Sequence, residues 1–239
     1  MVKLPALSRV PVAPLHWKNG CRLLPARYQA LECFERLLDP GEESLADILS
    51  RLADLTAGSG AGDLSLLDPS RVLFGAGAGW IDTSYTVPRP ARFSTARRGA
   101  FYAAGDFETA VAEVRHHLER DYLREGITEP LVLDYRALRV HIQGLFHDIR
   151  GKNPARSPWS AIYASEEYRD SQAFAVALWG GGSMGLAYDS LRRSSGTCVA
   201  VFDPTALRGC RHNTYLAFRW NGRAITLVQE KRIIALRGS

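Results

Sequence analysis

The sequence predicts an α+β fold: a single domain with a mixed or antiparallel core sheet and helices packed on its faces. Three observations lead to this prediction. The second half of the chain is dominated by short segments in which apolar and polar residues alternate, as they do in half-buried strands. Several longer segments instead carry apolar residues at helical spacing. Asn221-Gly222 lies between two strand-like segments and is the strongest hairpin signal in the chain.

The N-terminal part of the chain is expected to hold an arm, a strand and two helices. Residues 1–20 should form an irregular N-terminal arm, and residues 21–239 the domain itself. A short strand is expected at Cys21–Leu24. Helical periodicity covers Leu31–Leu38 and Ser44–Thr56, with Asp39-Pro40-Gly41 as the break between them.

Two small-residue loops follow, at Gly58–Gly62 and Gly75–Gly79. The second loop reads GAGAG, but it lacks the strand-to-helix frame and the acidic residue of a dinucleotide-binding fingerprint. Its glycines are therefore expected to permit a tight backbone path rather than to hold a cofactor.

A strand, turn and helix unit is expected between Ala91 and His117. The segment from Arg92 to Gly105 is hairpin-like, because it has a polar turn at Arg97–Gly99 and aromatic residues that favour extended structure. Asp106 is placed to act as the N-cap of the helix. The buried stripe of that helix is predicted to consist of Phe107, Ala110, Val111, Val114 and Leu118.

Strands dominate the rest of the chain. A polar loop at Pro154–Pro158 and a helix at Glu166–Leu178, ending at Gly180–Gly182, interrupt them. The predicted strands are LVLDY, LRVHI and GLFHDI within residues 131–149, LAYDS and CVAVF within residues 186–202, and TYLAFRW and AITLVQE on either side of Asn221-Gly222.

Arg92, Tyr102 and Glu113 form a candidate ligand site. Glu113 falls at the border of the apolar stripe, where a carboxylate on a rigid helix can project into a cleft. There the Arg92 guanidinium can hold an anion and the Tyr102 ring can stack on a planar group. The same residue types also occur as solvated or paired surface groups, so residue chemistry alone leaves both interpretations open.

The chain is basic, with a formal net charge of +5 and a pI of about 9.2. Its arginines are spread along the sequence and no helix-turn-helix or RNA-binding pattern is present, so direct nucleic-acid binding is not expected. An electropositive cleft or a face that docks an acidic partner explains the charge equally well. The adjacent pairs Arg97-Arg98 and Arg192-Arg193 can also be solvated turns.

The composition argues against membrane and secreted classes. No window approaches the roughly 18 apolar residues that span a bilayer. Prolines interrupt the N-terminus where a signal peptide needs an unbroken apolar core. We therefore expect a cytoplasmic protein that does not bind membranes.

No metal centre or hydrolase triad is expected. His116 and His117 are adjacent and point in different directions on a helix. Ser190 lies in no G-x-S-x-G turn. The four cysteines lie far apart without a C-x-x-C pair, which indicates neither zinc nor disulfides; they are Cys21, Cys33, Cys198 and Cys210.

Five segments of the chain, from about residue 20 to residue 230, resemble RES-domain proteins, which are best known as the toxins of bacterial RES/Xre toxin-antitoxin pairs. The segments are CRLLPARYQALECFERLLDP, GAGWIDTSYT, RFSTARRGAFYAAGDFETAVAEVRHH, SQAFAVALWGGGSMGLAYDSLRR and TYLAFRWNGRAITLVQE. The arginine, glutamate and serine that name the family match Arg92, Glu113 and Ser190. The most specific parts of the match are the spacing from Tyr102 to Glu113 and the Y-x-S-x-R pattern that begins at Tyr188.

The resemblance implies a fold like that of diphtheria-toxin-type ADP-ribosyltransferases. It also implies an enzyme that uses NAD+ as a co-substrate, without a metal. ADP-ribose would pass to a protein, which is mono-ADP-ribosylation, or NAD+ would be broken down by water or phosphate, as in a glycohydrolase or phosphorylase. The sequence leaves this acceptor open.

The resemblance also assigns roles that suit the residue types. Breaking the nicotinamide–ribose bond builds positive charge on the sugar, which a fixed carboxylate at Glu113 would stabilise. Arg92 and Arg22 match family arginines and are the candidates for holding the pyrophosphate or the adjoining ribose. Tyr102 would stack on the nicotinamide ring, and Ser190 would hydrogen-bond the ribose or orient Glu113.

Two places depart from the family pattern. Arg27, followed by Tyr28, competes with Arg22 as the N-terminal site arginine. Shorter family members usually carry a Gly-Gly-Arg-Trp-Asn run where this chain has residues 90–94 with the sequence PARFS, so Ser94 stands in place of the asparagine.

The expected partners follow from the same resemblance. They are a cognate Xre-like antitoxin, which would bind DNA itself and cover the cleft of this chain, and a protein target if ADP-ribose is transferred. A homodimer is left open, since no sequence signal indicates it. The alternative from another functional class is a non-catalytic interaction module with the same fold, which would leave NAD+ untouched.

Overall fold

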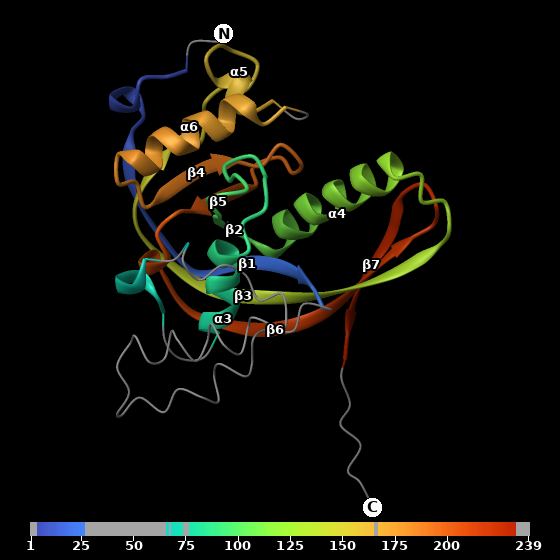
Figure 1. The fold of residues 1–239 in the computed structure, drawn as a ribbon. Helices are drawn as coiled ribbons and strands as arrows, with labels where there is room; N and C mark the ends of the chain where they lie inside the picture. The colour runs from blue at the N-terminus through green and yellow to red at the C-terminus, as the bar shows by residue number, and fades with distance from the viewer. Residues whose placement is uncertain (1–3, 27–65, 67, 74–76, 165–166, 233–239) are drawn as a thin grey trace, which may run out of the picture.

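The computed structural model describes residues 4–26, 66, 68–73, 77–164 and 167–232. In these residues helices pack around a seven-stranded mixed sheet, which confirms the predicted α+β class (Figure 1). The strands are β1 (Val12–Pro25), β2 (Phe101–Ala104), β3 (Leu131–Asp148), β4 (Gly185–Asp189), β5 (Thr197–Val201), β6 (Leu207–Trp220) and β7 (Ile225–Lys231). The helices are α3 (Ala78–Thr86), α4 (Phe107–Arg124), α5 (Trp159–Ile162) and α6 (Arg169–Gly180), with 3-10 turns η1 (Leu7–Arg9), η3 (Pro69–Arg71) and η4 (Pro204–Ala206).

Strand β3 organises the sheet because both of its edges are paired. One edge pairs with antiparallel β1, from Tyr135 to His147. The other edge pairs first with antiparallel β6 and then, at His147 and Asp148, with parallel β4. The strand order is β1-β2-β5-β4-β3-β6-β7, and the additional β1–β3 pairing joins the first five strands into a closed ring. Strands β6 and β7 extend the sheet beyond this ring as a hairpin.

The ring has a weak seam between β1 and β2. A single residue pair, Cys21 with Ala104, joins these two strands in the part of the chain that the structure describes. Next to that pair, the Arg22 side chain donates a hydrogen bond of 3.4 Å to the Tyr102 carbonyl. A side chain thus replaces the backbone ladder, and the two strands separate.

The helices cover different parts of the sheet (Figure 1). Helix α4 contacts β1, β2 and β7, whereas α3 contacts β6 and β2. Helices α5 and α6 contact each other and lie beside β4 in Figure 1. The seam between β1 and β2 therefore lies beneath α4.

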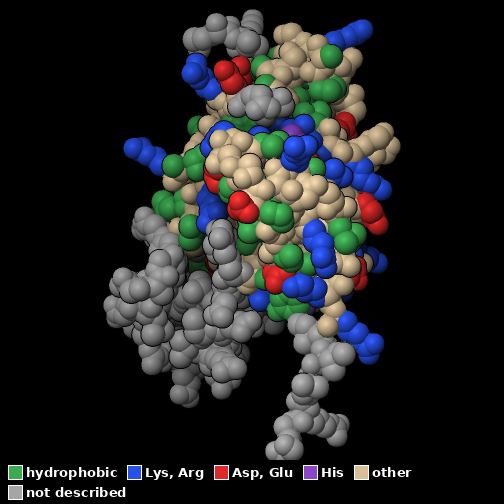
Figure 2. Space-filling model, turned by 90° about the vertical axis from the view of Figure 1, so that its right-hand side faces the viewer, with side chains coloured by type: hydrophobic (Ala, Val, Ile, Leu, Met, Phe, Trp, Pro, Cys, Tyr) green, Lys and Arg blue, Asp and Glu red, His purple; other side chains and the backbone are tan. Residues whose placement is uncertain are grey.

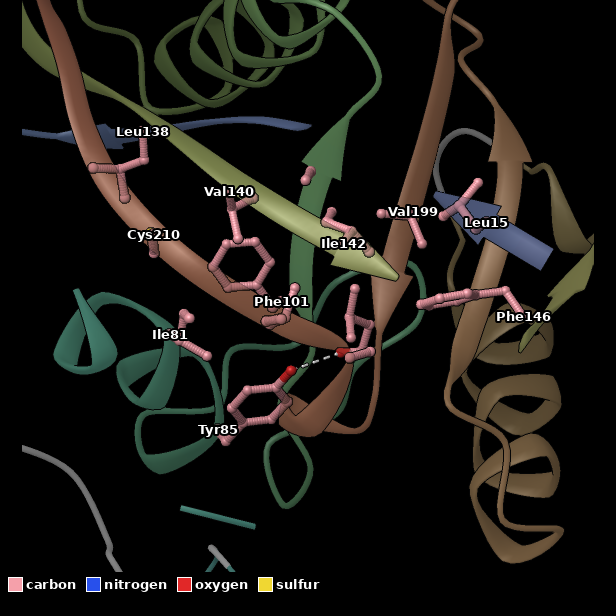
Figure 3. Packing of buried hydrophobic residues seen from close by; sticks show 14 residues of the cluster. Leu15, Ile81, Tyr85, Phe101, Leu138, Val140, Ile142, Phe146, Val199 and Cys210 are labelled. Atoms are coloured by element: carbon pink, nitrogen blue, oxygen red, sulfur yellow. Dashed lines mark hydrogen bonds between the residues drawn. The ribbon is translucent and has the colours of Figure 1, made fainter. Parts of the chain in front are cut away.

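One apolar cluster joins the strands of the ring to α3 (Figure 3). Tyr85 of α3 is buried in it, and its hydroxyl donates a hydrogen bond of 3.1 Å to the Val201 carbonyl of β5. Strands β1, β2, β3 and β5 contribute, among others, Leu15, Phe101, Ile142 and Val199. Burial of this surface fixes the ring as a rigid platform.

Helix α4 forms as the sequence predicts. The Asp106 carboxylate accepts a hydrogen bond of 2.8 Å from the Thr109 amide and caps the first turn. All members of the predicted apolar stripe pack in one cluster with residues of β1, β5 and β6; they are Phe107, Ala110, Val111, Val114 and Leu118. Because this stripe is packed against the sheet, the position of Glu113 at its border is fixed relative to the strands.

Three predicted elements change their limits. Strand β1 begins at Val12, so the expectation of an irregular arm is wrong for residues 12–20. The strand-like segments of residues 131–149 form the single long β3. The hairpin-like segment is not a hairpin, because only Phe101–Ala104 is a strand and it pairs with the distant β5. In each case a partner far along the chain decides the structure.

Other predictions are confirmed or completed. The Asn221-Gly222 hairpin joins β6 and β7, and the predicted helix at Glu166–Leu178 is α6, which begins at Arg169. Helix α3 was not predicted; it begins at Ala78, inside the GAGAG run, so the predicted loop Gly75–Gly79 is wrong for its last two residues. The predicted helices Leu31–Leu38 and Ser44–Thr56 and the loop Gly58–Gly62 lie outside the described residues.

Within the described ranges, no helix is both long and apolar enough to cross a membrane.

Gly77 at the start of α3 provides a test of the packing of this helix. Its φ is +81°, and an added Cβ would lie 1.8 Å from the Cys210 carbonyl oxygen. Gly77→Ala should lower the free energy of unfolding by about 3 kcal/mol or more, because left-handed strain and backbone overlap act together. Gly126 has a similar φ of +68° but open space around its Cβ position, so Gly126→Ala should cost only about 1 kcal/mol. Urea unfolding of both variants measures the difference, and equal losses would contradict it.

Asp82 on α3 should make stability depend on pH. Burial raises its pKa to about 7, and its Oδ1 has no hydrogen-bond partner. Because the unfolded chain ionises this group near its usual pKa, the folded state binds more protons between about pH 4 and pH 7, and stability from this group falls as pH rises through that window. Asp82→Asn should therefore gain stability relative to wild type as pH rises from 4 to 7. Parallel curves of unfolding free energy against pH would contradict this.

Candidate active site

One cavity of about 360 Å³ brings together four of the five predicted site residues. It lies at the β1–β2 seam beneath α4 and is bordered by residues that follow β4. Arg22, Arg92, Tyr102 and Glu113 line it, and Ser190 donates a hydrogen bond to Glu113. Residues separated by most of the chain length therefore meet in one cleft.

The Glu113 carboxylate is held by Ser190. The Ser190 Oγ lies 2.5 Å from Glu113 Oε1. The same Oγ accepts hydrogen bonds from the backbone amides of Arg192 (3.0 Å) and Arg193 (3.2 Å). A hydroxyl has one proton to donate, and the two amides occupy its acceptor side, so the proton is directed to Glu113. The carboxylate is thus fixed by a neutral donor that leaves its negative charge in place.

Arg92 lines the cavity and is held there by backbone carbonyls and a ring. Its Nη1 donates to the carbonyls of Ile162 (3.1 Å) and Ala164 (2.6 Å), and its guanidinium lies 5.2 Å from the Tyr168 ring centroid. Among the described residues, no carboxylate forms an ion pair with it, and its Nε and Nη2 make no hydrogen bond. Those donors remain available for an anion.

Tyr102 has a structural role beside its place in the cavity wall. Its hydroxyl accepts a hydrogen bond of 2.9 Å from the Phe93 amide and donates one of 3.1 Å to Ser94 Oγ. Ser94 in turn donates to the Arg89 carbonyl at 2.7 Å. Burial raises the pKa of Tyr102 to about 12, so the hydroxyl stays protonated. Tyr102 therefore fixes the turn that carries Arg92, and Ser94, which replaces the family asparagine, belongs to the same network.

Arg22 lies at the seam. Its guanidinium is 4.4 Å from the Phe101 ring centroid, and its buried Nε has no hydrogen-bond partner. Burial lowers its pKa to about 10, which still leaves it charged near neutral pH. In the described part of the chain no carboxylate pairs with it. The competing candidate Arg27 lies outside the described residues.

Several polar lining residues were not predicted as members of the site, among them His117, Arg120 and Tyr168. His117 and Arg120 follow Glu113 by four and seven residues on α4, so helical spacing could have placed them on the same face. Tyr168 precedes α6, and its hydroxyl accepts a hydrogen bond of 3.0 Å from Arg120. Only the tertiary fold brings Tyr168 to α4, and no local signal in the sequence indicates it.

The cavity is electropositive. Four arginines line it, namely Arg22, Arg92, Arg120 and Arg192, against the two carboxylates of Glu113 and Asp189. Of these arginines, Arg120 also forms an ion pair of 2.8 Å with Asp121, which is not part of the lining. On the face shown in Figure 2, Lys and Arg side chains lie among acidic and apolar ones. The excess of arginines in its lining makes the cavity suited to an anionic ligand.

The two thiols in the cavity wall are buried and protonated at neutral pH. Burial raises the pKa of Cys21 to about 11 and raises that of Cys198 further, so both thiols remain protonated at neutral pH. The third described cysteine, Cys210, is also buried and unbridged. Across the described residues, no three His, Cys, Asp or Glu side chains gather in a group that could hold a metal ion.

The fold and the cleft define an α+β domain with one glutamate, fixed by a serine, in an electropositive cavity. The chain belongs to the RES domain family, whose family model matches residues 68–221, as the sequence predicts. That match contains Arg92, Tyr102, Glu113 and Ser190. It is shorter than the expected stretch of residues 20–230 and does not include Arg22.

Among solved structures, the chain is similar to one from the crystal structure of the M. tuberculosis MbcT-MbcA toxin-antitoxin complex. The identity is 13%, the TM-score is 0.45, and the similarity covers 86% of each chain. No curated protein matches this chain.

The structural role of Tyr102 can be tested by removing its hydroxyl. Tyr102→Phe should lower the free energy of unfolding by about 1–3 kcal/mol, because the amide of the buried Phe93 loses its acceptor. Tyr168→Phe is the matched control. Its hydroxyl lies at the partly exposed cavity wall, where water can replace it, and the expected loss is below about 1 kcal/mol. Urea unfolding of both variants measures these losses. A Tyr102→Phe protein as stable as wild type would contradict the structural role of the Tyr102 hydroxyl.

Proposed function

We propose that this chain is an NAD+-consuming enzyme and the toxin component of a toxin-antitoxin pair. In the proposed reaction the nicotinamide–ribose bond of NAD+ breaks and ADP-ribose passes to a nucleophile on a cellular protein. The observation that carries the proposal is the Glu113 carboxylate, held by Ser190 in a cavity where arginines outnumber carboxylates.

Glu113 has the chemistry that this bond cleavage needs. Nicotinamide leaves with the bonding electron pair as a neutral molecule, and the ribose carbon becomes cationic. A carboxylate fixed before the reaction stabilises that developing charge without having to reorganise. The acceptor then forms the new bond to the ribose carbon and releases its proton. Because Ser190 holds Glu113 through a neutral hydrogen bond, the negative charge stays available for the transition state.

The arginines of the cavity suit the rest of NAD+. Its pyrophosphate carries two negative charges, and arginines outnumber carboxylates in the lining of the cavity. The Nε of Arg22 is buried without a partner, and Arg92 uses only Nη1 to bind the protein among the described residues. In the proposal these two residues hold the pyrophosphate or the adjoining ribose. Tyr102 then offers its ring to nicotinamide while its hydroxyl stays in the Phe93 and Ser94 network.

The toxin role rests on membership of the RES family. Its members are best known as toxins neutralised by an Xre-like antitoxin. Such a partner would bind DNA itself and cover the cleft of this chain. An arginine-rich cleft favours an acidic segment at that contact.

The proposal is tested by incubating the purified protein, free of any antitoxin, with adenine-labelled NAD+ in a cell lysate. Free nicotinamide and label on protein bands are both followed. Wild type should release nicotinamide and label a discrete band. Glu113→Gln should lower kcat by about 100-fold or more with little change in KM, because the interaction it loses is strongest in the transition state.

Glu108→Gln is the control, since Glu108 is an exposed glutamate in the first turn of the same helix. It should behave as wild type. Nicotinamide release without a labelled band would contradict transfer to a protein and would show that water or phosphate is the acceptor. No NAD+ turnover by wild type would contradict the enzyme itself and would favour a non-catalytic interaction module.

A further inference from the structure

The loop between β4 and β5, residues 190–196, contacts α4 at two successive turns. At one turn Ser190 donates to Glu113. One turn earlier, Thr109 lies against Gly196 so closely that an added Cβ on Gly196 would be 2.7 Å from Thr109 Oγ1. Thr109 and Glu113 are four residues apart and share one face of the helix. The β4–β5 loop therefore lies along the face of α4 that presents the glutamate.

Arg193 fastens this loop to the first turn of α4. Its Nη1 lies 3.2 Å from both carboxylate oxygens of Asp106 and 3.2 Å from Thr109 Oγ1. Asp106 is itself fixed, because it caps the helix through the Thr109 amide and hydroxyl, each at 2.8 Å. Arg193 thus binds groups that the helix already holds rigid.

Hydrogen bonds within the β4–β5 loop connect Arg193 to Ser190, so fixing Arg193 on α4 also fixes Ser190. The Ser190 amide donates to the Gly196 carbonyl at 2.8 Å, and the Gly196 amide donates to the Arg193 carbonyl at 3.0 Å. The Arg193 amide closes the circuit by donating to Ser190 Oγ at 3.2 Å. The side chain of Arg193 is therefore anchored on α4 while its amide aims the serine hydroxyl.

We infer that Arg193 is a positioning residue for the reaction: its contact with Asp106 and Thr109 locks the β4–β5 loop onto α4 and so keeps Ser190 aimed at Glu113. This inference rests on the proposed NAD+ chemistry of Glu113. Arg193 is exposed at the surface and acts through Ser190. Its loss is expected to change the rate of bond cleavage and not the binding of NAD+.

A double-mutant cycle tests this mechanism. Arg193→Ala should lower kcat for nicotinamide release by about tenfold, in the range that small misplacements of catalytic groups produce, with KM unchanged. In a Ser190→Ala background the same substitution should have no further effect on kcat, because both changes remove the same restraint. Arg193→Lys keeps a positive charge next to the Asp106 carboxylate, so its kcat should lie between those of Arg193→Ala and wild type.

The control is Arg115→Ala, which removes an exposed ion pair of 2.9 Å with Glu119 on the same helix. It should leave kcat and KM as in wild type. If the double variant lost kcat by the product of the two single losses, the inference would be overturned, since Arg193 would then act independently of Ser190. A raised KM would overturn it as well and would place Arg193 in ligand binding.

A measurement without turnover separates this inference from the proposed function. Hydrogen exchange of the amides of Arg192, Arg193 and Gly196 should become about tenfold faster in Arg193→Ala than in wild type, and stay unchanged in Arg115→Ala. Unchanged exchange in Arg193→Ala would overturn the lock. If exchange is faster in Arg193→Ala but wild type does not consume NAD+, the contact of Arg193 with α4 is supported and only the proposed function is overturned.

Discussion

The antiparallel pairing of β1 with β3 is the constraint on which the rest of the structure depends. It closes five strands into a ring and leaves β2 joined to β1 by a single residue pair. The pairing of the ring is shortest at this seam, where Arg22 adds a side-chain hydrogen bond beside the single residue pair. Helix α4 packs over the seam, so Glu113 lines a cavity at the place where β1 and β2 separate. The cleft is a consequence of incomplete strand pairing under a well-packed helix.

Three charged groups of the cleft, Arg92, Arg22 and Glu113, share one kind of support. Arg92 is held by carbonyl oxygens and a tyrosine ring, Arg22 by a carbonyl oxygen and a phenylalanine ring, and Glu113 by a hydroxyl. Carbonyls, rings and hydroxyls orient a charge without neutralising it, whereas an ion pair would consume it. Burying such charges lowers the stability of the empty protein. In the proposed function, the NAD+ pyrophosphate would recover part of that free energy when it binds the arginines.

Much of the fold can be predicted from local sequence, and the site only in part. The cap at Asp106, the apolar stripe of α4 and the Asn221-Gly222 hairpin are encoded within a few residues, and the structure confirms them. The limits of β1 and β3 could not be predicted, because cross-strand partners more than a hundred residues away decide where each strand begins. The structure brings Arg22, Arg92, Tyr102 and Glu113 to one cavity, but the second role of Tyr102 depends on a turn at Phe93 whose geometry no pattern revealed. Tyr168 was missed because only the packing of α6 against the sheet brings it to α4.

The order in which the cleft is assembled has a consequence for synthesis on the ribosome. Its walls come from β1, from the segment at Arg92, from α4 and from the residues that follow β4. During translation, β1 leaves the ribosome long before β3, its antiparallel partner in the ring. Ser190 follows later still, so Glu113 emerges before the hydroxyl that orients it. A nascent chain consequently carries every arginine of the cleft except Arg192 without a formed active site, and the complete arrangement arises only when the last fifth of the polypeptide docks.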